Sequence, residues 1–123
     1  MSTVRVLLVD DELSSAEVLA LVLAGEGYEV TVAPDARQAL ARLDETAPDL
    51  LVTDFMMPGM NGAELARVIR ERERFRALPV LMISGAPQSA LKAYGRHYDA
   101  FLRKPFGLEQ LLDALQVLRH SAG

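Results

Sequence analysis

The chain has 123 residues, half of which are hydrophobic, and it carries a formal net charge of −4. This length and composition suit one folded domain with a sizeable core, so we expect residues 1–123 to form a single domain. The acidic balance argues against a nucleic-acid-binding surface, because such surfaces are usually basic. The absence of cysteine excludes a disulfide framework and fits a reducing cytoplasm, where we expect the protein to act.

Targeting and membrane signals are not visible in the sequence. The N-terminus does not resemble a signal peptide. The longest apolar stretch, residues 18–24, is far shorter than the roughly 20 residues that a membrane span requires. We therefore predict no membrane association.

The first half of the chain alternates between predicted strands and helices. Residues 4–9 form a run of β-branched residues and leucine that is typical of a central strand, and residues 28–32 form a shorter strand. Between them we expect a helix that is capped by Ser14 or Ser15 and ended at Gly25. The apolar face of this helix consists of Leu13, Ala16, Leu19, Ala20, Leu23 and Ala24.

A second helix, capped by Asp35, is expected next, and Pro48 separates it from a third strand over residues 50–53. Its apolar residues have the i, i+3, i+4, i+7 spacing of a helix: Ala36, Ala39, Leu40 and Leu43. Gly62 opens a third helix, whose inward positions are Leu65, Ala66 and Ile69. We interpret the charged run at residues 70–74 as a solvated helix end.

Residues 80–83 form the predicted fourth strand, and residues 98–102 lead into the fifth. Pro87 is expected to begin a fourth helix between them, because proline is tolerated in the first turn. The last helix has a clear amphipathic pattern, formed by Leu108, Leu111, Leu112, Leu115 and Leu118. Five strand–helix alternations imply a parallel sheet with helices on both faces.

Polar side chains follow four of the five predicted strands. These residues are Asp10 and Asp11, Asp54, Ser84 and Lys104. The carboxyl ends of parallel strands meet at one edge of a sheet, where ligands bind. Taken singly, each residue is also explained as a turn former, a cap or a surface lysine. Their convergence favours a functional site.

Asp10, Asp11 and Asp54 are expected to repel one another, by about 4 kcal/mol for a pair about 4 Å apart at an effective dielectric constant of about 20. A divalent cation would relieve this repulsion. A site built only from oxygen ligands suits Mg²⁺, with Mn²⁺ as the alternative metal. The competing interpretation is an acidic pocket that binds no metal.

Four segments resemble a known family when they are taken together. They are residues 9–12 (Val-Asp-Asp-Glu), 54–62 (Asp-Phe-Met-Met-Pro-Gly-Met-Asn-Gly), 84–86 (Ser-Gly-Ala) and 104–106 (Lys-Pro-Phe). In this order and spacing they resemble the receiver domain of two-component response regulators, over nearly the whole chain. The resemblance implies an α/β fold of the flavodoxin-like, doubly wound (βα)5 kind, with a five-stranded parallel sheet of order 2-1-3-4-5.

The resemblance also implies roles for the acidic residues. Asp54 is the expected phosphoacceptor, since carboxylates form aspartyl-phosphates in other proteins. Asp11, Asp54 and the backbone carbonyl of Met56 are expected to bind Mg²⁺ directly, and Asp10 largely through water.

Lys104 and the hydroxyl of Ser84 are expected to stabilise the phosphoryl oxygens. Ser84 would then move inward, and by resemblance Phe101 would rotate into the vacated space. This would change the surface of the fourth helix, fifth strand and fifth helix. The alternative for Phe101 is an ordinary core aromatic. The resemblance also implies a cis peptide before Pro105.

We expect this domain to take a phosphoryl group from a histidine kinase or phosphotransfer protein and to act on a downstream output domain or target protein. Formation of a homodimer on phosphorylation is an alternative that the sequence leaves open. We expect no direct nucleic-acid binding and no turnover of a separate substrate. A receiver-like interaction module that works without phosphorylation is the second hypothesis. A phosphatase is the third, and the lack of a second acid two residues after Asp54 disfavours it.

Two features depart from the family pattern. Met56 and Ala86 lack polar groups that could steer a hydrolytic water, so we predict a slow to moderate phosphate lifetime. Residues 95–100 (Gly-Arg-His-Tyr-Asp-Ala) differ from the usual Gly-Ala-Asp-Asp, which weakens assignment to the subfamily that dimerises through paired charges. His97 in this stretch is expected to be neither a ligand nor a phosphoacceptor.

Overall fold

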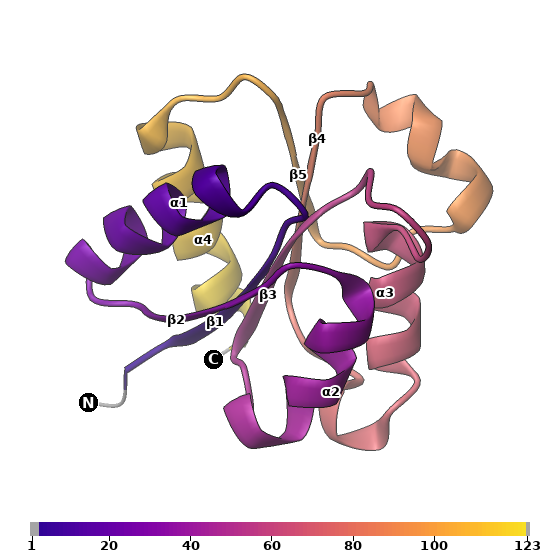
Figure 1. Ribbon diagram of the computed structural model, residues 1–123, viewed down its shortest axis with the longest axis horizontal. Helices are drawn as coiled ribbons and strands as arrows, with labels where there is room; N and C mark the ends of the chain where they lie inside the picture. Colours follow the sequence, from indigo (N-terminus) through magenta and orange to yellow (C-terminus); the bar gives the residue numbers. More distant parts are fainter. Residues whose placement is uncertain (1–2, 123) are drawn as a thin grey trace.

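A computed structural model of the protein describes residues 3–122. Strands and helices alternate along the chain (Figure 1). The strands are β1 (Arg5–Val9), β2 (Glu29–Ala33), β3 (Leu50–Asp54), β4 (Val80–Ser84) and β5 (Ala100–Arg103). The α-helices are α1 (Leu13–Gly25), α2 (Ala36–Thr46), α3 (Gly62–Arg70) and α4 (Leu108–Ala122), and the 3-10 helices are η1 (Glu73–Phe75) and η2 (Gln88–Tyr94).

The five strands form one parallel sheet in the order β2-β1-β3-β4-β5, as predicted. The register places Val9 beside Thr53, Asp54 beside Ile83, and Ser84 beside Arg103. The carboxyl ends of β1, β3, β4 and β5 therefore lie at one edge of the sheet. Every residue of β3 and β4 is buried, because helices cover both faces of these central strands.

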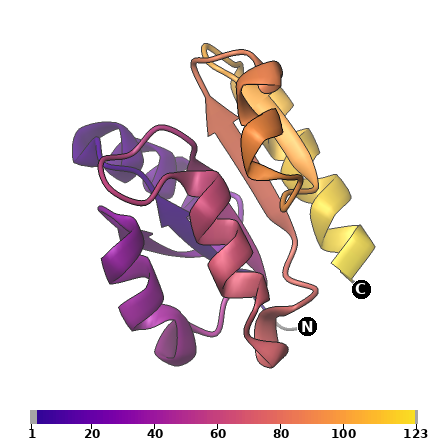
Figure 2. The ribbon, with the colours of Figure 1, turned by 90° about the vertical axis from the view of Figure 1, so that its right-hand side faces the viewer.

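Two hydrophobic layers hold the helices against the sheet. One face of the sheet packs against α1 and α4, with Leu23 and Leu115 among its buried residues. The other face packs against α2, α3 and η2, with Leu43, Ile69 and Leu91 among its buried residues. Figure 1 shows the sheet between these two layers, and Figure 2 views it from the side of α2, α3 and η2. Within residues 3–122, none of the helices combines the length and the hydropathy that crossing a bilayer requires.

The caps of two helices differ in how well the sequence predicts them. Asp35 caps α2 as expected, with its carboxylate accepting a 2.7 Å hydrogen bond from the Gln38 amide. The prediction that Ser14 or Ser15 caps α1 is wrong, because the helix begins earlier, after Glu12. Ser15 lies inside the first turn and its hydroxyl donates back to the Glu12 carboxylate at 2.6 Å.

The segment after Pro87 is also different from the prediction. It forms the 3-10 helix η2 rather than an α-helix, and it ends at Gly95, whose φ is 77°. Leu91 is its only buried residue, so no apolar stripe of α-helical spacing fixes it against the sheet.

Some predicted faces are more exposed or more buried than the sequence pattern indicates. Leu13 and Leu108 are 48% and 49% exposed, since each begins a helix at the rim of the sheet. Arg70 is not a solvated helix end: its guanidinium donates to the Leu78 carbonyl and forms an ion pair with Asp99. It therefore links the end of α3 to the segments that precede β4 and β5.

Candidate functional site

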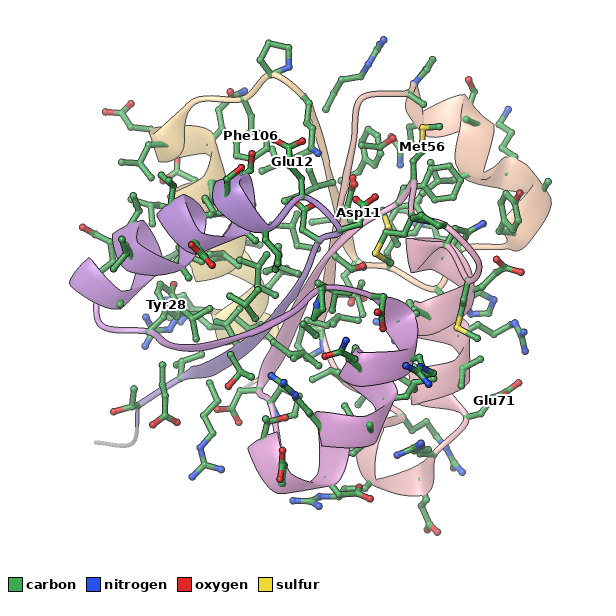
Figure 3. All side chains as sticks on the ribbon, viewed as in Figure 1. Asp11, Glu12, Tyr28, Met56, Glu71 and Phe106 are labelled. Atoms are coloured by element: carbon green, nitrogen blue, oxygen red, sulfur yellow. The ribbon has the colours of Figure 1, made fainter. Side chains whose placement is uncertain are left out.

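Three carboxylates meet where β1 and β3 end. Asp10 and Asp11 follow β1, and Asp54 is the last residue of β3. Because the two strands pair in parallel, the residues that follow them are neighbours. One oxygen from each carboxylate lies within 4.8 Å of the others. Figure 3 shows Asp11 at the ends of the strands, and Met56 on the connection that follows β3.

Lys104, the residue that follows β5, joins this cluster. Its Nζ lies 3.4 Å from Oδ1 of Asp54, and the Asp54 side chain is nearly buried whereas that of Lys104 is 41% exposed. The peptide between Lys104 and Pro105 is cis, as the resemblance implies. The site therefore brings one ammonium group against three carboxylates.

Burial is the main cause of a raised pKa at Asp54, and the nearby charges of Asp10 and Asp11 raise this pKa further. The positive charge and hydrogen bond of Lys104 act in the opposite direction without cancelling the effect. Ionised Asp54 is thus a group whose negative charge is only partly compensated by the protein.

The donor set fits a hard divalent cation. Its side chains offer carboxylate oxygens only, and Asp11 is exposed enough to leave room for water ligands. These features suit Mg²⁺ or Mn²⁺. The part assigned to the Met56 carbonyl stays a prediction, and the Met56 side chain is 63% exposed at the rim.

Ser84 ends β4 beside this cluster and is fully buried. Its Oγ accepts a 2.9 Å hydrogen bond from the Ala86 amide, and its carbonyl accepts one from the Lys104 amide at 2.8 Å. The structure therefore directs the Ser84 oxygen toward its own turn. Because the hydroxyl acts as an acceptor here, its proton remains able to serve another acceptor.

Phe101 is half-buried on β5 and packs against the hydrophobic layer on the α2 and α3 side of the sheet. Its ring centroid lies 6.4 Å from that of Tyr98. Tyr98 in turn is buried and accepts a hydrogen bond from the Gln88 side chain at 3.1 Å. Phe101 is therefore linked to η2 through Tyr98, by an aromatic contact and then a hydrogen bond to Gln88.

Two residues that support Asp54 were not anticipated from the sequence. The Thr53 hydroxyl donates to the Asp54 carbonyl at 3.0 Å within a fully buried strand. The sequence indication of this role is that Thr53 is the only hydroxyl residue in the apolar run of residues 50–53. A Cβ at Gly62 would lie 2.2 Å from the same carbonyl oxygen. Gly62 thus allows α3 to start directly against the end of β3.

A groove of about 840 Å³ leads to the site. It runs between α1 and the connection from β5 to α4, and Asp10, Asp54 and Lys104 line one end. Figure 3 shows Glu12 and Phe106 at this end. Asp54 is therefore reached from outside despite its burial.

Comparison with known proteins identifies the family. A sequence model described as the response regulator receiver domain matches residues 6–116. The chain belongs to this family. As a receiver domain it is part of two-component signal transduction, and its flavodoxin-like fold is the fold of its solved relatives.

Individual relatives agree with this assignment. The transcriptional regulatory protein TrcR of Mycobacterium tuberculosis is 35% identical over 98% of this receiver domain and 48% of its own length. The chemotaxis protein CheY4 of Vibrio cholerae is 33% identical, with a TM-score of 0.86 over 95% of this chain and 99% of that one. TrrA of Thermotoga maritima, solved in complex with Mg²⁺-BeF, is 29% identical, with a TM-score of 0.83 over 94% and 99%. The chain spans about half the length of the curated relatives it matches.

Proposed function

We propose that Asp54 accepts a phosphoryl group from a histidine kinase or phosphotransfer protein, and that the resulting aspartyl-phosphate changes the surface of η2, β5 and α4. The observation that carries this proposal is the convergence of Lys104, Asp10 and Asp11 on a nearly buried Asp54 at the end of an open groove. A cluster of this kind costs stability and has no packing role.

The transfer forms one bond and breaks one. A carboxylate oxygen of Asp54 attacks phosphorus, and the P–N bond of the donor phosphohistidine breaks as its imidazole leaves and takes up a proton. In phosphoryl transfer, the protein mainly positions the reacting groups and stabilises negative charge. Lys104 supplies one fixed positive charge next to Asp54, and the Ser84 hydroxyl proton supplies a donor.

Asp10, Asp11, Asp54 and the Met56 carbonyl are the groups that would hold Mg²⁺, or Mn²⁺ in its place. When bound, this ion supplies positive charge that offsets the charge of the phosphoryl oxygens. TrrA, whose structure is described as a complex with Mg²⁺-BeF, supports this assignment by similarity.

The signal would then pass through Ser84 and Phe101. A phosphoryl group carries roughly −1.5 to −2 charges, enough to attract the buried Ser84 hydroxyl. Movement of Ser84 shifts the start of the β4–η2 connection, and Phe101 rotates toward the space beside β5. The partner of the changed surface would be an output domain or a separate target protein, in the cytoplasm, and a homodimer is one form that this contact can take.

Two other functions predict different chemistry. A receiver-like interaction module would work without phosphorylation, and a phosphatase would turn over external phosphoesters. We propose no separate substrate, because no second acid lies two residues beyond Asp54, where Met56 stands.

Intact-mass measurement separates the three functions. The protein is incubated with acetyl phosphate and Mg²⁺, and we expect a gain of one phosphoryl group that is absent in Asp54→Asn. An Asp113→Asn variant, altered at an acid on α4 outside the cluster, should gain it as the wild type does. An unmodified wild-type protein, or steady hydrolysis of p-nitrophenyl phosphate, would overturn the proposal.

A further inference from the structure

Met56 is a methionine that the fold leaves open to solvent. Its side chain is 63% exposed, and it belongs to neither hydrophobic layer of the sheet. Among the residues that the structure describes, the other methionines are buried or partly buried in the layer on the α2 and α3 side: Met57, Met60 and Met82. Core packing therefore gives no reason for a methionine at position 56.

The backbone holds Met56 close to the proposed phosphoacceptor. The preceding residue, Phe55, donates its amide to the Ile83 carbonyl at 2.8 Å, and its own carbonyl accepts from the Gly62 amide at 2.8 Å. Residues 56–61 therefore form a short loop that is closed at both ends beside the end of β3, and Figure 3 shows Met56 on it. A chemical change in this side chain takes place next to the site.

A thioether sulfur that solvent reaches is open to oxidation by hydrogen peroxide. The sulfur attacks one peroxide oxygen and the O–O bond breaks. The other oxygen leaves as hydroxide, which takes the proton of the transferred oxygen and becomes water. The sulfur loses two electrons to the peroxide, and the product is methionine sulfoxide, which sulfoxide reductases reduce again. Because hydrogen peroxide is uncharged at pH 7, the carboxylates of the site do not repel it.

We propose that Met56 is a site of reversible oxidation, and that its sulfoxide shortens the lifetime of the phosphoryl group on Asp54. The thioether sulfur is a weak hydrogen-bond acceptor, whereas the sulfoxide is polar and can orient a water molecule toward phosphorus. Oxidation of Met57 or Met82 would instead place a polar group in the core. Oxidation at the exposed position leaves the hydrophobic layers intact, so it changes the site without unfolding the domain.

The two parts of this proposal depend on different things. Selective oxidation of Met56 follows from its exposure and needs no phosphoryl group. The effect on lifetime rests on the proposed function, because it requires an aspartyl-phosphate at Asp54. Together they would make the phosphorylated fraction of the domain fall when peroxide is present and recover when the sulfoxide is reduced.

Peptide mapping by mass spectrometry tests the first part. The folded protein is treated with hydrogen peroxide at pH 7 without a phosphodonor. We expect sulfoxide to form at Met56 threefold or more faster than at Met57, Met60 or Met82. In urea, where all four sulfurs are exposed, this difference should disappear. An equal rate at any of the other three in the folded protein, or a preference for Met56 that persists in urea, would overturn the proposal.

Decay of the mass adduct tests the second part. Oxidised and untreated proteins are phosphorylated with acetyl phosphate and Mg²⁺, and the donor is removed. We expect the oxidised protein to lose its phosphoryl group threefold or more faster, and treatment with methionine sulfoxide reductases A and B to restore the slower decay. Met56→Gln, which carries an amide oxygen in place of the thioether, should decay faster without peroxide.

Met56→Leu is the matched control, because it keeps an apolar side chain without an oxidisable sulfur. Peroxide treatment should leave the decay rate of this variant as it was. An equal acceleration in Met56→Leu would assign the effect to another methionine and overturn the proposal, as would an unchanged decay rate after oxidation of Met56. Absence of any adduct in the untreated protein would overturn the proposed function and the lifetime effect, whereas the peptide map would still decide the oxidation site.

Discussion

Asp54 is the residue at which function and stability oppose each other. Its carboxylate is nearly buried, and the net effect of burial, Asp10, Asp11 and Lys104 is a raised pKa. A carboxyl group with a raised pKa in the folded state ionises more easily in the unfolded chain. Its negative charge therefore lowers the free energy of unfolding at pH 7.

We predict that Asp54→Asn raises the free energy of unfolding by about 1 kcal/mol at pH 7 in the presence of a chelator. The gain should be present above the folded-state pKa of Asp54, should shrink as the pH falls toward the unfolded pKa of about 3.9, and should disappear below it, where the carboxyl is neutral in both states. Urea denaturation at several pH values measures it. A lower melting temperature for Asp54→Asn in chelator would contradict the repulsion argument.

At the same scale, Met56 and Ala86 are the residues from which we predict the lifetime of the aspartyl-phosphate. Both side chains are apolar, and Met56 lies at the exposed rim of the site. Neither can orient a water molecule toward the phosphoryl group, so the aspartyl-phosphate should persist for minutes or longer with Mg²⁺. Met56→Asn adds a polar group and should shorten the lifetime several-fold. A wild-type lifetime of seconds, measured by loss of the mass adduct, would refute this prediction.

At the scale of secondary-structure elements, the connection from β3 to α3 positions Asp54. The Gly62 amide donates to the Phe55 carbonyl at 2.8 Å, and Asn61 and Glu64 form a capping box at the start of the helix. The helix thus starts where a side chain on residue 62 would collide with the Asp54 backbone.

We predict that Gly62→Ala lowers the free energy of unfolding by about 2 kcal/mol, because the added Cβ forces the Asp54 carbonyl or the helix to move. The rate of phosphorylation by acetyl phosphate should fall as well. Gly25→Ala is the matched control, since a Cβ there has open space around it. Equal stability and equal rates in the two variants would contradict a positioning role for Gly62.

Elements that depend on local sequence were predictable, and those that depend on tertiary contacts were not. Asp35 lies at the correct offset from an apolar stripe, so its capping role follows from the sequence. The start of α1 is set by the acidic turn that precedes it, so the serines were misassigned. Arg70 looks like any charged helix-end residue until the fold brings the Leu78 carbonyl and Asp99 to it.

At the scale of the whole molecule, the alternation of strands and helices is enough to predict a parallel sheet with one functional edge. The strand order came from the family motifs, because periodicity does not distinguish among doubly wound orders. Distances within the site, and the orientation of the Ser84 hydroxyl toward Ala86, depend on the packed structure and are not encoded by any local pattern.

Binding of Mg²⁺ should stabilise the whole domain, because the ion would bind the folded cluster and not the separated acids of the unfolded chain. At roughly ten times its Kd, the ion is expected to add about 1.4 kcal/mol to the free energy of unfolding. Asp11→Asn should lose most of this gain. Glu17→Gln, an exposed acid on α1 outside the cluster, should keep it. Equal stabilisation of both variants would place the metal elsewhere.

The most direct test of the account is to identify the residue that carries the phosphoryl group. After treatment with acetyl phosphate and Mg²⁺, borohydride reduction converts an aspartyl-phosphate to homoserine, and peptide mapping locates it. We predict homoserine at position 54 alone. Homoserine at position 10 or 11, or its absence from position 54, would contradict the account.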